Sequence, residues 1–180
     1  MKKCAYLLIL ISVFTLGLAG YKLILCAFHP IKYKTEIEQY SKKLDLSPSL
    51  VASVINVESS YRHTAKSTRD AIGLMQIKLS TAKYLCEVYK TNENLTEADL
   101  YNANTNIKYG CLYLRYLIDK FQDTNTALAG YNAGETRVRA WLKDEAYSSD
   151  GETLKQIPYQ ETHNYVKKVN NNLKFYNNVF

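Results

Sequence analysis

The sequence has none of the residue patterns that identify two common functional classes. Arginine-rich runs with interleaved aromatic side chains do not occur in its 180 residues, which argues against nucleic acid as a partner. His-X-His and Cys-X-X-Cys spacings are also missing, so the sequence implies no zinc site, and nothing in it implies another metal or an organic cofactor. Strand-like alternation, internal repeats and low-complexity linkers are absent as well. The helical periodicity of the chain is therefore the main guide to its structure.

Cysteines and acidic residues are both in short supply. Two of the four cysteines lie in an apolar leader, whereas Cys86 and Cys111 fall among apolar residues at helical spacing. A disulfide between these two would be allowed outside the cell, but buried free thiols are the favoured interpretation. Lys and Arg outnumber Asp and Glu by 23 to 17, which gives a net charge of +6. This basic character suits an anionic polymer or a membrane surface without choosing between them.

An export or anchor signal occupies residues 1–30. Two lysines precede an apolar stretch over residues 5–28 that contains one further lysine, and its length matches the ~20 residues that span a bilayer. The lysines at the start place the N-terminus in the cytoplasm. Residues 31–180 would then form an extracytoplasmic domain behind a single transmembrane helix. The alternative is a secreted protein, since the small residues near Ala19 would permit cleavage by signal peptidase.

Residues 31–180 carry the periodicity of one predominantly helical domain. Ser47 and Pro48 have the residue types of an N-cap and a first helical position. The clearest amphipathic stripe is long enough to form a central support, and residues 59–72 are expected to be irregular. The expected helices are residues 31–46, a segment that begins at Pro48, and residues 79–90, 104–121 (the central stripe), 126–131, 136–141 and 162–173.

Glu58 has an unusual position in this pattern. Val51, Val54, Ile55 and Glu58 recur at helical spacing, which puts a carboxylate on an apolar face near the end of a helix. A half-buried carboxyl loses hydration, so its pKa rises and it can remain protonated near neutral pH. A general acid for the cleavage of a glycosidic bond needs this property. Taken alone, a solvated glutamate at a helix end is the commoner situation.

Four ordered motifs make the catalytic interpretation much more specific. They are Glu58-Ser59-Ser60-Tyr61, then Gly73-Leu74-Met75-Gln76-Ile77, then Ala129-Gly130-Tyr131-Asn132-Ala133-Gly134, and finally Ile157-Pro158-Tyr159-Gln160-Glu161-Thr162 with Tyr165-Val166. Together they resemble the soluble lytic transglycosylase (SLT) catalytic domain family. Residues 100–114, with Asn106 and Gly110, look like the central helix of that family. The resemblance extends over nearly all of the exported part.

The resemblance implies a mainly α fold of the α+β, goose-type-lysozyme-like kind, with a substrate cleft in a single helical domain. In this family a glutamate, here Glu58, protonates the oxygen between N-acetylmuramic acid and N-acetylglucosamine of peptidoglycan glycan strands. The N-acetyl group of the substrate assists, and no carboxylate nucleophile is used. The same glutamate then acts as a base toward the C6 hydroxyl, so the product has a 1,6-anhydromuramoyl end. We see no second acid in a comparable motif, and no metal or organic cofactor is implied.

The resemblance also suggests which residues bind the glycan. Gly73 would allow close approach of the sugar, Met75 would be an apolar wall, and the Tyr131 hydroxyl would lie near the carboxylate. Plain structural roles remain open for the serines at the helix end and for the turn at residues 73–77, and Tyr159 and Val166 fit the core equally well. The candidate substrate-binding residues are Ser59, Ser60, Gly73, Met75, Gln76, Tyr131, Asn132 and Tyr165.

Some positions depart from the usual pattern of the family. Gly130 stands where alanine is common, Lys78-Leu79 replaces a frequent Met-Pro, and Gln160 replaces a common arginine. None of these changes removes a catalytic group, but they put the preference among glycan strands in doubt. Three tyrosines at positions 109, 113 and 116 lie off the apolar stripe of the central helix and are expected to face solvent or the cleft; we assign them no role.

Two rival functions remain. A hydrolytic muramidase could use a lone glutamate on the same scaffold, and a catalytically idle wall-binding module could share the fold. An intact Glu58 argues against the second. The biological setting is left open among wall turnover, division, and the opening of the wall for secretion or conjugation machinery.

Overall fold

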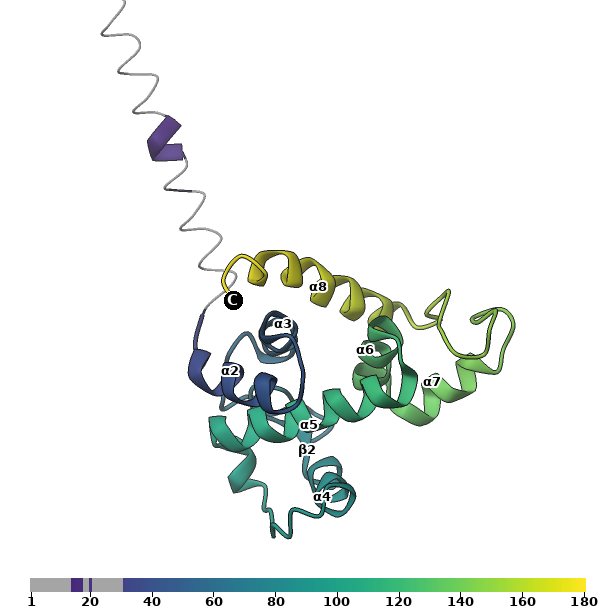
Figure 1. Ribbon diagram of the computed structural model, residues 1–180, viewed down its shortest axis with the longest axis horizontal. Coiled ribbons are helices and arrows are strands. Elements are labelled where there is room, and N and C mark those ends of the chain that lie inside the picture. Colours follow the sequence, from purple (N-terminus) through teal and green to yellow (C-terminus); the bar gives the residue numbers. More distant parts are fainter. Residues whose placement is uncertain (1–13, 18–19, 21–30) are drawn as a thin grey trace, which may run out of the picture. The chain divides into compact units, whose positions relative to one another are not determined.

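Helices make up most of residues 32–180 in the computed structural model, which describes residues 14–17, 20 and 31–180 (Figure 1). The elements of this domain are α2 (Lys34–Lys43), α3 (Pro48–Ser59), β1 (Ala71–Ile72), β2 (Ile77–Lys78), α4 (Leu79–Val88), the 3-10 helix η1 (Ala98–Tyr101), α5 (Ala103–Phe121), α6 (Thr124–Ala133), α7 (Glu135–Leu142) and α8 (Gln160–Tyr176). The prediction of a predominantly helical domain is confirmed, and each expected helix is present with small displacements at its ends.

The domain also contains one short pair of strands, which no pattern in the sequence indicated and which fits the α+β kind that the resemblance implied. β1 and β2 form an antiparallel pair in which Ala71 lies opposite Lys78 and Ile72 lies opposite Ile77. Each strand is only two residues long, so the sequence has no room for the alternation by which strands are recognised. The hairpin is nevertheless important, because its turn at residues 73–77 is the second of the four motifs.

Helix α3 begins and ends where its sequence predicts. The Ser47 hydroxyl accepts a hydrogen bond from the backbone N–H of Leu50 at 3.4 Å, and Pro48 is the first helical residue. The helix ends because Ser60 has a φ of 50°, in the left-handed region, while its N–H still donates to the Asn56 carbonyl. Apart from the last turn, most of the helix is buried, so its carboxylate-bearing end is held on a rigid support.

Helix α5 forms the predicted central support, with contacts to α2, α4, α6, η1 and β2. Its predicted apolar stripe is buried, and Ile107, Leu114 and Leu117 are fully enclosed. Tyr109, which was expected to face solvent or the cleft, is also fully buried. Neighbours on several sides bury more of the helix than one stripe, and the Tyr109 hydroxyl finds a polar partner by donating to Glu93 at 3.0 Å.

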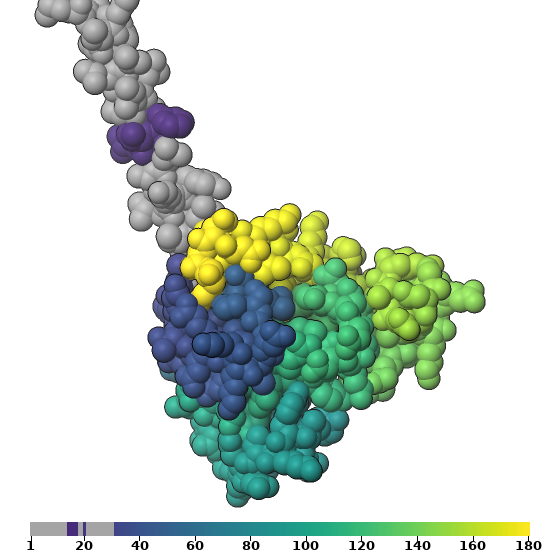
Figure 2. Space-filling view, viewed as in Figure 1, coloured from purple at the N-terminus to yellow at the C-terminus, as the bar shows by residue number. Residues whose placement is uncertain are grey.

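Helix α8 closes the domain by packing along α3 and α6 (Figure 1). Val166 and Val169 supply its buried face. On the face drawn in Figure 2, the yellow atoms of the C-terminal segment border the blue atoms of the first helices and the green atoms of α6. The two ends of the domain sequence are thus joined in one core, in which α8 covers α3.

Most of the predicted membrane anchor lies outside the described residues, as do Cys4 and Cys26. Among the residues that are described, no helix has both the length and the apolar character needed to span a bilayer. The other two cysteines, Cys86 and Cys111, are buried free thiols.

Candidate active site

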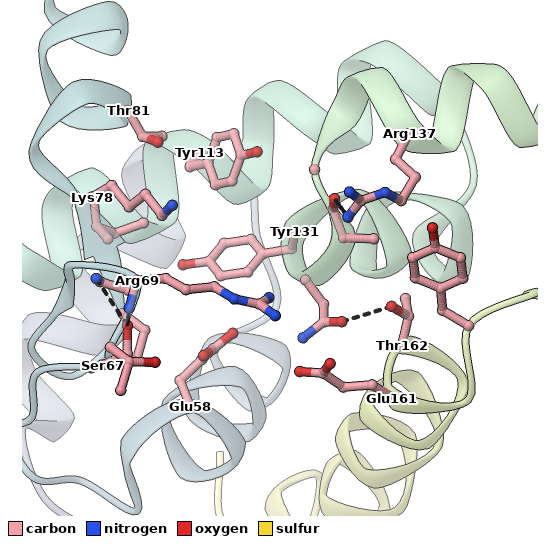
Figure 3. A pocket seen from close by; sticks show the side chains of 18 residues that line it. Glu58, Ser67, Arg69, Lys78, Thr81, Tyr113, Tyr131, Arg137, Glu161 and Thr162 are labelled. Carbon is pink, nitrogen blue, oxygen red and sulfur yellow. Dashed lines mark hydrogen bonds between the residues drawn. The ribbon is translucent and has the colours of Figure 1, made fainter.

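The Glu58 carboxyl lies in the last turn of α3, at the wall of a cavity of about 860 Å³ (Figure 3). The side chain is half-buried, and burial raises the pKa of the carboxyl to about 7, while an interaction with the Tyr165 hydroxyl works in the opposite direction. The expectation of a half-buried carboxyl with a raised pKa is confirmed. Near neutral pH both protonation states are populated, so this group can either donate or accept a proton.

Two buried tyrosines lie near Glu58. The Tyr131 hydroxyl donates a hydrogen bond to the Met75 carbonyl at 2.8 Å, whereas the buried Tyr165 hydroxyl has no hydrogen bond of standard geometry and interacts with the Glu58 carboxyl. Burial and the negative charge of Glu58 raise the pKa of both phenols well above the ordinary value. Both hydroxyls therefore keep their protons at neutral pH and can act only as neutral hydrogen-bonding groups.

The turn at residues 73–77 is built from close contacts. Gly73 has a φ of 77°, and a Cβ atom there would lie 2.6 Å from the Leu100 carbonyl oxygen, so only glycine fits. A Cβ on Gly110 of α5 would lie 2.2 Å from Met75 Sδ. Met75 is thus fully buried against α5 and does not line the cavity, in contrast to the expectation of an apolar cleft wall.

Asn106 ties this turn to the rest of the domain. Its fully buried amide accepts a hydrogen bond from the Met75 N–H at 2.8 Å. The same amide donates to the carbonyl oxygens of Ile72 at 2.8 Å and Leu100 at 2.7 Å. One side chain therefore satisfies three backbone groups from two separate segments. The sequence marked Asn106 only as part of the central helix, and nothing in its spacing showed these partners.

Of the two serines that follow Glu58, neither lines the cavity. Ser59 is buried, and its hydroxyl donates to the Leu74 carbonyl at 2.8 Å, so it joins the end of α3 to the turn. Ser60 is exposed and forms the left-handed end of the helix. For both serines the structure shows a contribution to local architecture instead of the expected position in the cleft.

Gln76 and Asn132 do line the cavity, together with Tyr131. The Gln76 amide nitrogen donates to the Gly73 carbonyl at 2.9 Å, which leaves its oxygen as the group that faces a ligand as an acceptor. The Asn132 amide oxygen accepts from the Thr162 hydroxyl at 2.8 Å, so its NH₂ group is the complementary donor. One acceptor and one donor of this kind match the N-acetyl and hydroxyl groups of a sugar.

Several further residues line the cavity, although no role there was assigned to them from the sequence. Tyr113 packs against Tyr131 with ring centroids 5.1 Å apart, so one of the three tyrosines without an assigned role belongs to the cavity. Tyr159 lines the cavity and is 50% exposed, whereas Val166 belongs to the core. The other additions carry charge or a hydroxyl and include Ser67, Arg69, Lys78, Thr81, Arg137, Glu161 and Thr162. Of all these further lining residues, those at positions 159, 161 and 162 lie within the fourth motif.

Glu161 is a second carboxylate at the cavity, in the first turn of α8. It belongs to the fourth motif, so the expectation that no motif holds a second acid was wrong. It is exposed to solvent, unlike the half-buried Glu58. The two carboxyls at the cavity thus lie in different surroundings, as two carboxyls with separate roles do in glycosidases. Within the described part of the chain, no group of three or more His, Cys, Asp or Glu side chains is arranged to hold a metal ion.

Comparisons with known proteins agree with this geometry. The chain is 34% identical over 142 residues to the soluble lytic murein transglycosylase of Salmonella typhimurium, which covers 78% of this chain and 22% of that protein. It is 34% identical over 137 residues to the membrane-bound lytic murein transglycosylase E of Buchnera aphidicola, which covers 74% of this chain and 60% of that protein. The chain thus spans about a fifth of the length of the soluble relative.

Solved structures support the same relationship. An inactive mutant of the lytic transglycosylase Slt from Pseudomonas aeruginosa superposes with a TM-score of 0.72 at 30% identity, over 82% of this chain and 24% of that one. The 70 kDa soluble lytic transglycosylase of Escherichia coli superposes with a TM-score of 0.73 at 28% identity, over 82% and 24%. The expected lysozyme-like helical fold is confirmed. Residues 35–155 also match the family described as Transglycosylase SLT domain, which agrees with the half-buried glutamate, the fixed turn and the ordered motifs at the cavity. This chain therefore belongs to that family.

Proposed function

We propose that this protein is a peptidoglycan lytic transglycosylase that cleaves the bond between N-acetylmuramic acid and N-acetylglucosamine, with Glu58 as its catalytic acid and base. The observation that carries the proposal is the Glu58 carboxyl with a pKa of about 7 at the wall of the cavity. Relatives over the same domain are named lytic murein transglycosylases, and murein is peptidoglycan.

The proposed reaction uses one carboxyl twice, first to give a proton and then to take another. Protonated Glu58 donates to the glycosidic oxygen while the bond from C1 of muramic acid to that oxygen breaks, and the substrate N-acetyl group stabilises the developing charge at C1. The Glu58 carboxylate then takes the proton of the muramoyl C6 hydroxyl as that oxygen bonds to C1. No water is consumed, and the carboxyl returns to its protonated state. A pKa near neutrality suits a group that performs both steps.

The expected binding residues fall into three groups in this proposal. Gln76, Tyr131 and Asn132 would contact the glycan directly, since all three line the cavity. Tyr165 would act on Glu58 through its hydroxyl. The remaining candidates, Ser59, Ser60, Gly73 and Met75, would support the cleft from behind or beside it, because none of them lines the cavity.

The test is digestion of purified peptidoglycan by the chain and by its Glu58→Gln variant, followed by mass spectrometry of the muropeptide ends. Products one water lighter than hydrolytic products, and absent with the variant, would support the proposal. Glutamine keeps the size and polarity of the side chain but has no carboxyl proton to deliver. A variant as active as the parent would refute the role of Glu58, and intact glycan with both proteins would favour a wall-binding module.

A hydrolytic muramidase is the second candidate, and the position of Glu161 at the cavity is the observation that favours it. Ordinary two-carboxylate glycosidases use a second acid as nucleophile or as the base that activates water. Under our proposal Glu161→Gln retains most of its activity and still gives anhydro ends. Hydrated ends from the parent, together with loss of cleavage in Glu161→Gln, would establish hydrolysis.

We further propose that residues 1–30 anchor the protein in the membrane and that residues 31–180 act on the outer side. The apolar leader with its preceding lysines supports this orientation, and one relative is named as membrane-bound. Membrane fractionation and the intact mass of the recovered protein would test it. Recovery in the soluble fraction with an N-terminus near residue 20 would favour secretion. A separate crosslinking experiment in membranes would identify any partners among wall-turnover or secretion machinery.

A further inference from the structure

Two cations at the cavity wall, Arg69 and Lys78, take no part in the proposed reaction. Arg69 lies in the loop before β1 and Lys78 lies on β2, and Figure 3 shows both side chains pointing into the cavity. Both residues are exposed, and neither forms an ion pair in the part of the chain that the structure describes. The third cation of the cavity, Arg137, differs because it donates to the Ala133 carbonyl and lies over the Tyr159 ring.

The loop that carries Arg69 is held by its own hydrogen bonds. The Ser67 hydroxyl accepts from the backbone N–H groups of Arg69 at 3.2 Å and Ala71 at 3.0 Å. The Ser67 N–H donates to the Ala71 carbonyl at 2.9 Å, and Asp70 adopts a left-handed φ of 59° to complete the turn. Arg69 therefore projects from a closed turn instead of a long free loop, which reduces the entropy lost when it binds a ligand.

The nearest carboxylate in the sequence does not neutralise Arg69. Asp70 lies 3.6 Å from the ammonium group of Lys66, which also donates to Glu97 at 2.8 Å. Ala71 and Lys78 are directly opposite in the hairpin, so their side chains share one face of it, and both line the cavity. Arg69 and Lys78 thus present two positive charges from the same end of the hairpin, and neither is held in one of the ion pairs of the described residues.

We infer that Arg69 and Lys78 form a carboxylate-binding site for the lactyl side of muramic acid, an inference that rests on the proposed function. The disaccharide repeat of peptidoglycan is neutral except at this lactyl group, which ends either in a free carboxylate or in a peptide that carries carboxylates. A guanidinium binds carboxylates in a two-pronged geometry and an ammonium group adds a mobile charge. Since lysine replaces the frequent methionine at position 78, this site would give the chain its own preference among strands.

The experiment measures binding to the full chain that carries Glu58→Gln, so that no ligand is cleaved. The probes are neutral tetra-N-acetylchitotetraose, a peptide-free tetrasaccharide of alternating N-acetylglucosamine and N-acetylmuramic acid, and the same tetrasaccharide with its peptides. Arg69→Gln with Lys78→Gln removes the site. Lys83→Gln with Lys155→Gln removes the same charge from exposed positions that do not line the cavity.

We expect a preference of about tenfold for a carboxylate-bearing probe over the neutral one at low salt, which falls to within about twofold in the Arg69/Lys78 variant and stays in the control. Preference for both muramic probes identifies the lactyl carboxylate as ligand, and preference for the peptide-bearing probe alone identifies the peptide carboxylates. An unchanged preference in the Arg69/Lys78 variant, or an equal loss in the control, overturns the inference. Binding of the neutral probe without any preference refutes this site alone, whereas failure to bind all three glycans refutes the proposed function as well.

Discussion

The surroundings of Glu58 determine the pKa of its carboxyl. Exposed carboxyls titrate near 4.5, and burial at the end of α3 moves this one to about 7, with the Tyr165 hydroxyl as the main opposing influence. The position was predictable, because three apolar residues at helical spacing precede Glu58. The contact with Tyr165 was not predictable from spacing, since it joins residues more than a hundred positions apart.

The pH dependence of activity follows from this pKa. Glycosidic cleavage needs the protonated carboxyl, so the rate of anhydromuropeptide formation should fall as the pH rises through about 7. Tyr165→Phe removes the hydroxyl that lowers the pKa of Glu58, so its falling limb should shift to higher pH. Tyr147→Phe, away from the cavity, is the matched control. Superimposable pH profiles for all three proteins would contradict this account.

The same group makes the domain less stable in alkaline solution. The folded pKa of about 7 lies above the unfolded value of about 4.5, so the folded state holds a proton that the unfolded state releases between these values. The free energy of unfolding should therefore decrease as the pH rises from 4.5 to 7. Glu58→Gln has no such group, and we expect it to be about 2 kcal/mol more stable than the parent at pH 8 but similar at pH 4.

Urea unfolding of both proteins at the two pH values measures this difference. A Glu58→Gln variant that is less stable than the parent at pH 8 would show that the carboxylate is well solvated or compensated in the fold.

At the scale of elements, the hairpin and its turn depend on contacts from outside themselves. Two-residue strands cannot stabilise a turn by themselves. Two of the three backbone groups that Asn106 satisfies, at Ile72 and Met75, lie more than thirty residues before it in the sequence. The helices could be predicted because their periodicity is local. The strands and η1 could not, because they are short and depend on tertiary contacts.

Replacement of Asn106 tests this dependence. Asn106→Asp keeps an acceptor for the Met75 N–H but loses the NH₂ group that serves the Ile72 and Leu100 carbonyls, and it buries a charge. We expect a loss of about 2–4 kcal/mol in the free energy of unfolding. Asn104→Asp, on an exposed position of the same helix, is the control and should stay within about 0.5 kcal/mol of the parent. Equal effects in chemical denaturation would refute the role of the amide.

At the scale of the whole molecule, the last helix completes both the core and the cavity. The family match ends at residue 155, yet α8 follows it, covers α3 and brings Glu161 and Thr162 to the cavity wall. The sequence predicted an amphipathic final helix. Its place along α3 could not be predicted, because it depends on how two distant apolar faces fit together.

Truncation measures what this helix contributes. A chain that ends at residue 155 would expose the apolar face of α3, so we expect it to lose the cooperative thermal transition and the glycan cleavage of the parent. A chain that ends at residue 177 retains all of α8 and serves as the control. A truncated chain with a parent-like transition would show that the first 155 residues fold without α8.

The buried thiol of Cys111 allows the opening of the folded domain to be measured by chemical modification. Cys111 is fully enclosed on α5, and burial raises the pKa of its thiol, so the reactive thiolate is rare and shielded. In a chain with serine at positions 4, 26 and 86, an alkylating reagent would modify Cys111 only when the centre of the domain opens. The alkylation rate would then report how often this domain exposes its core, and binding of a glycan in the cavity should slow it.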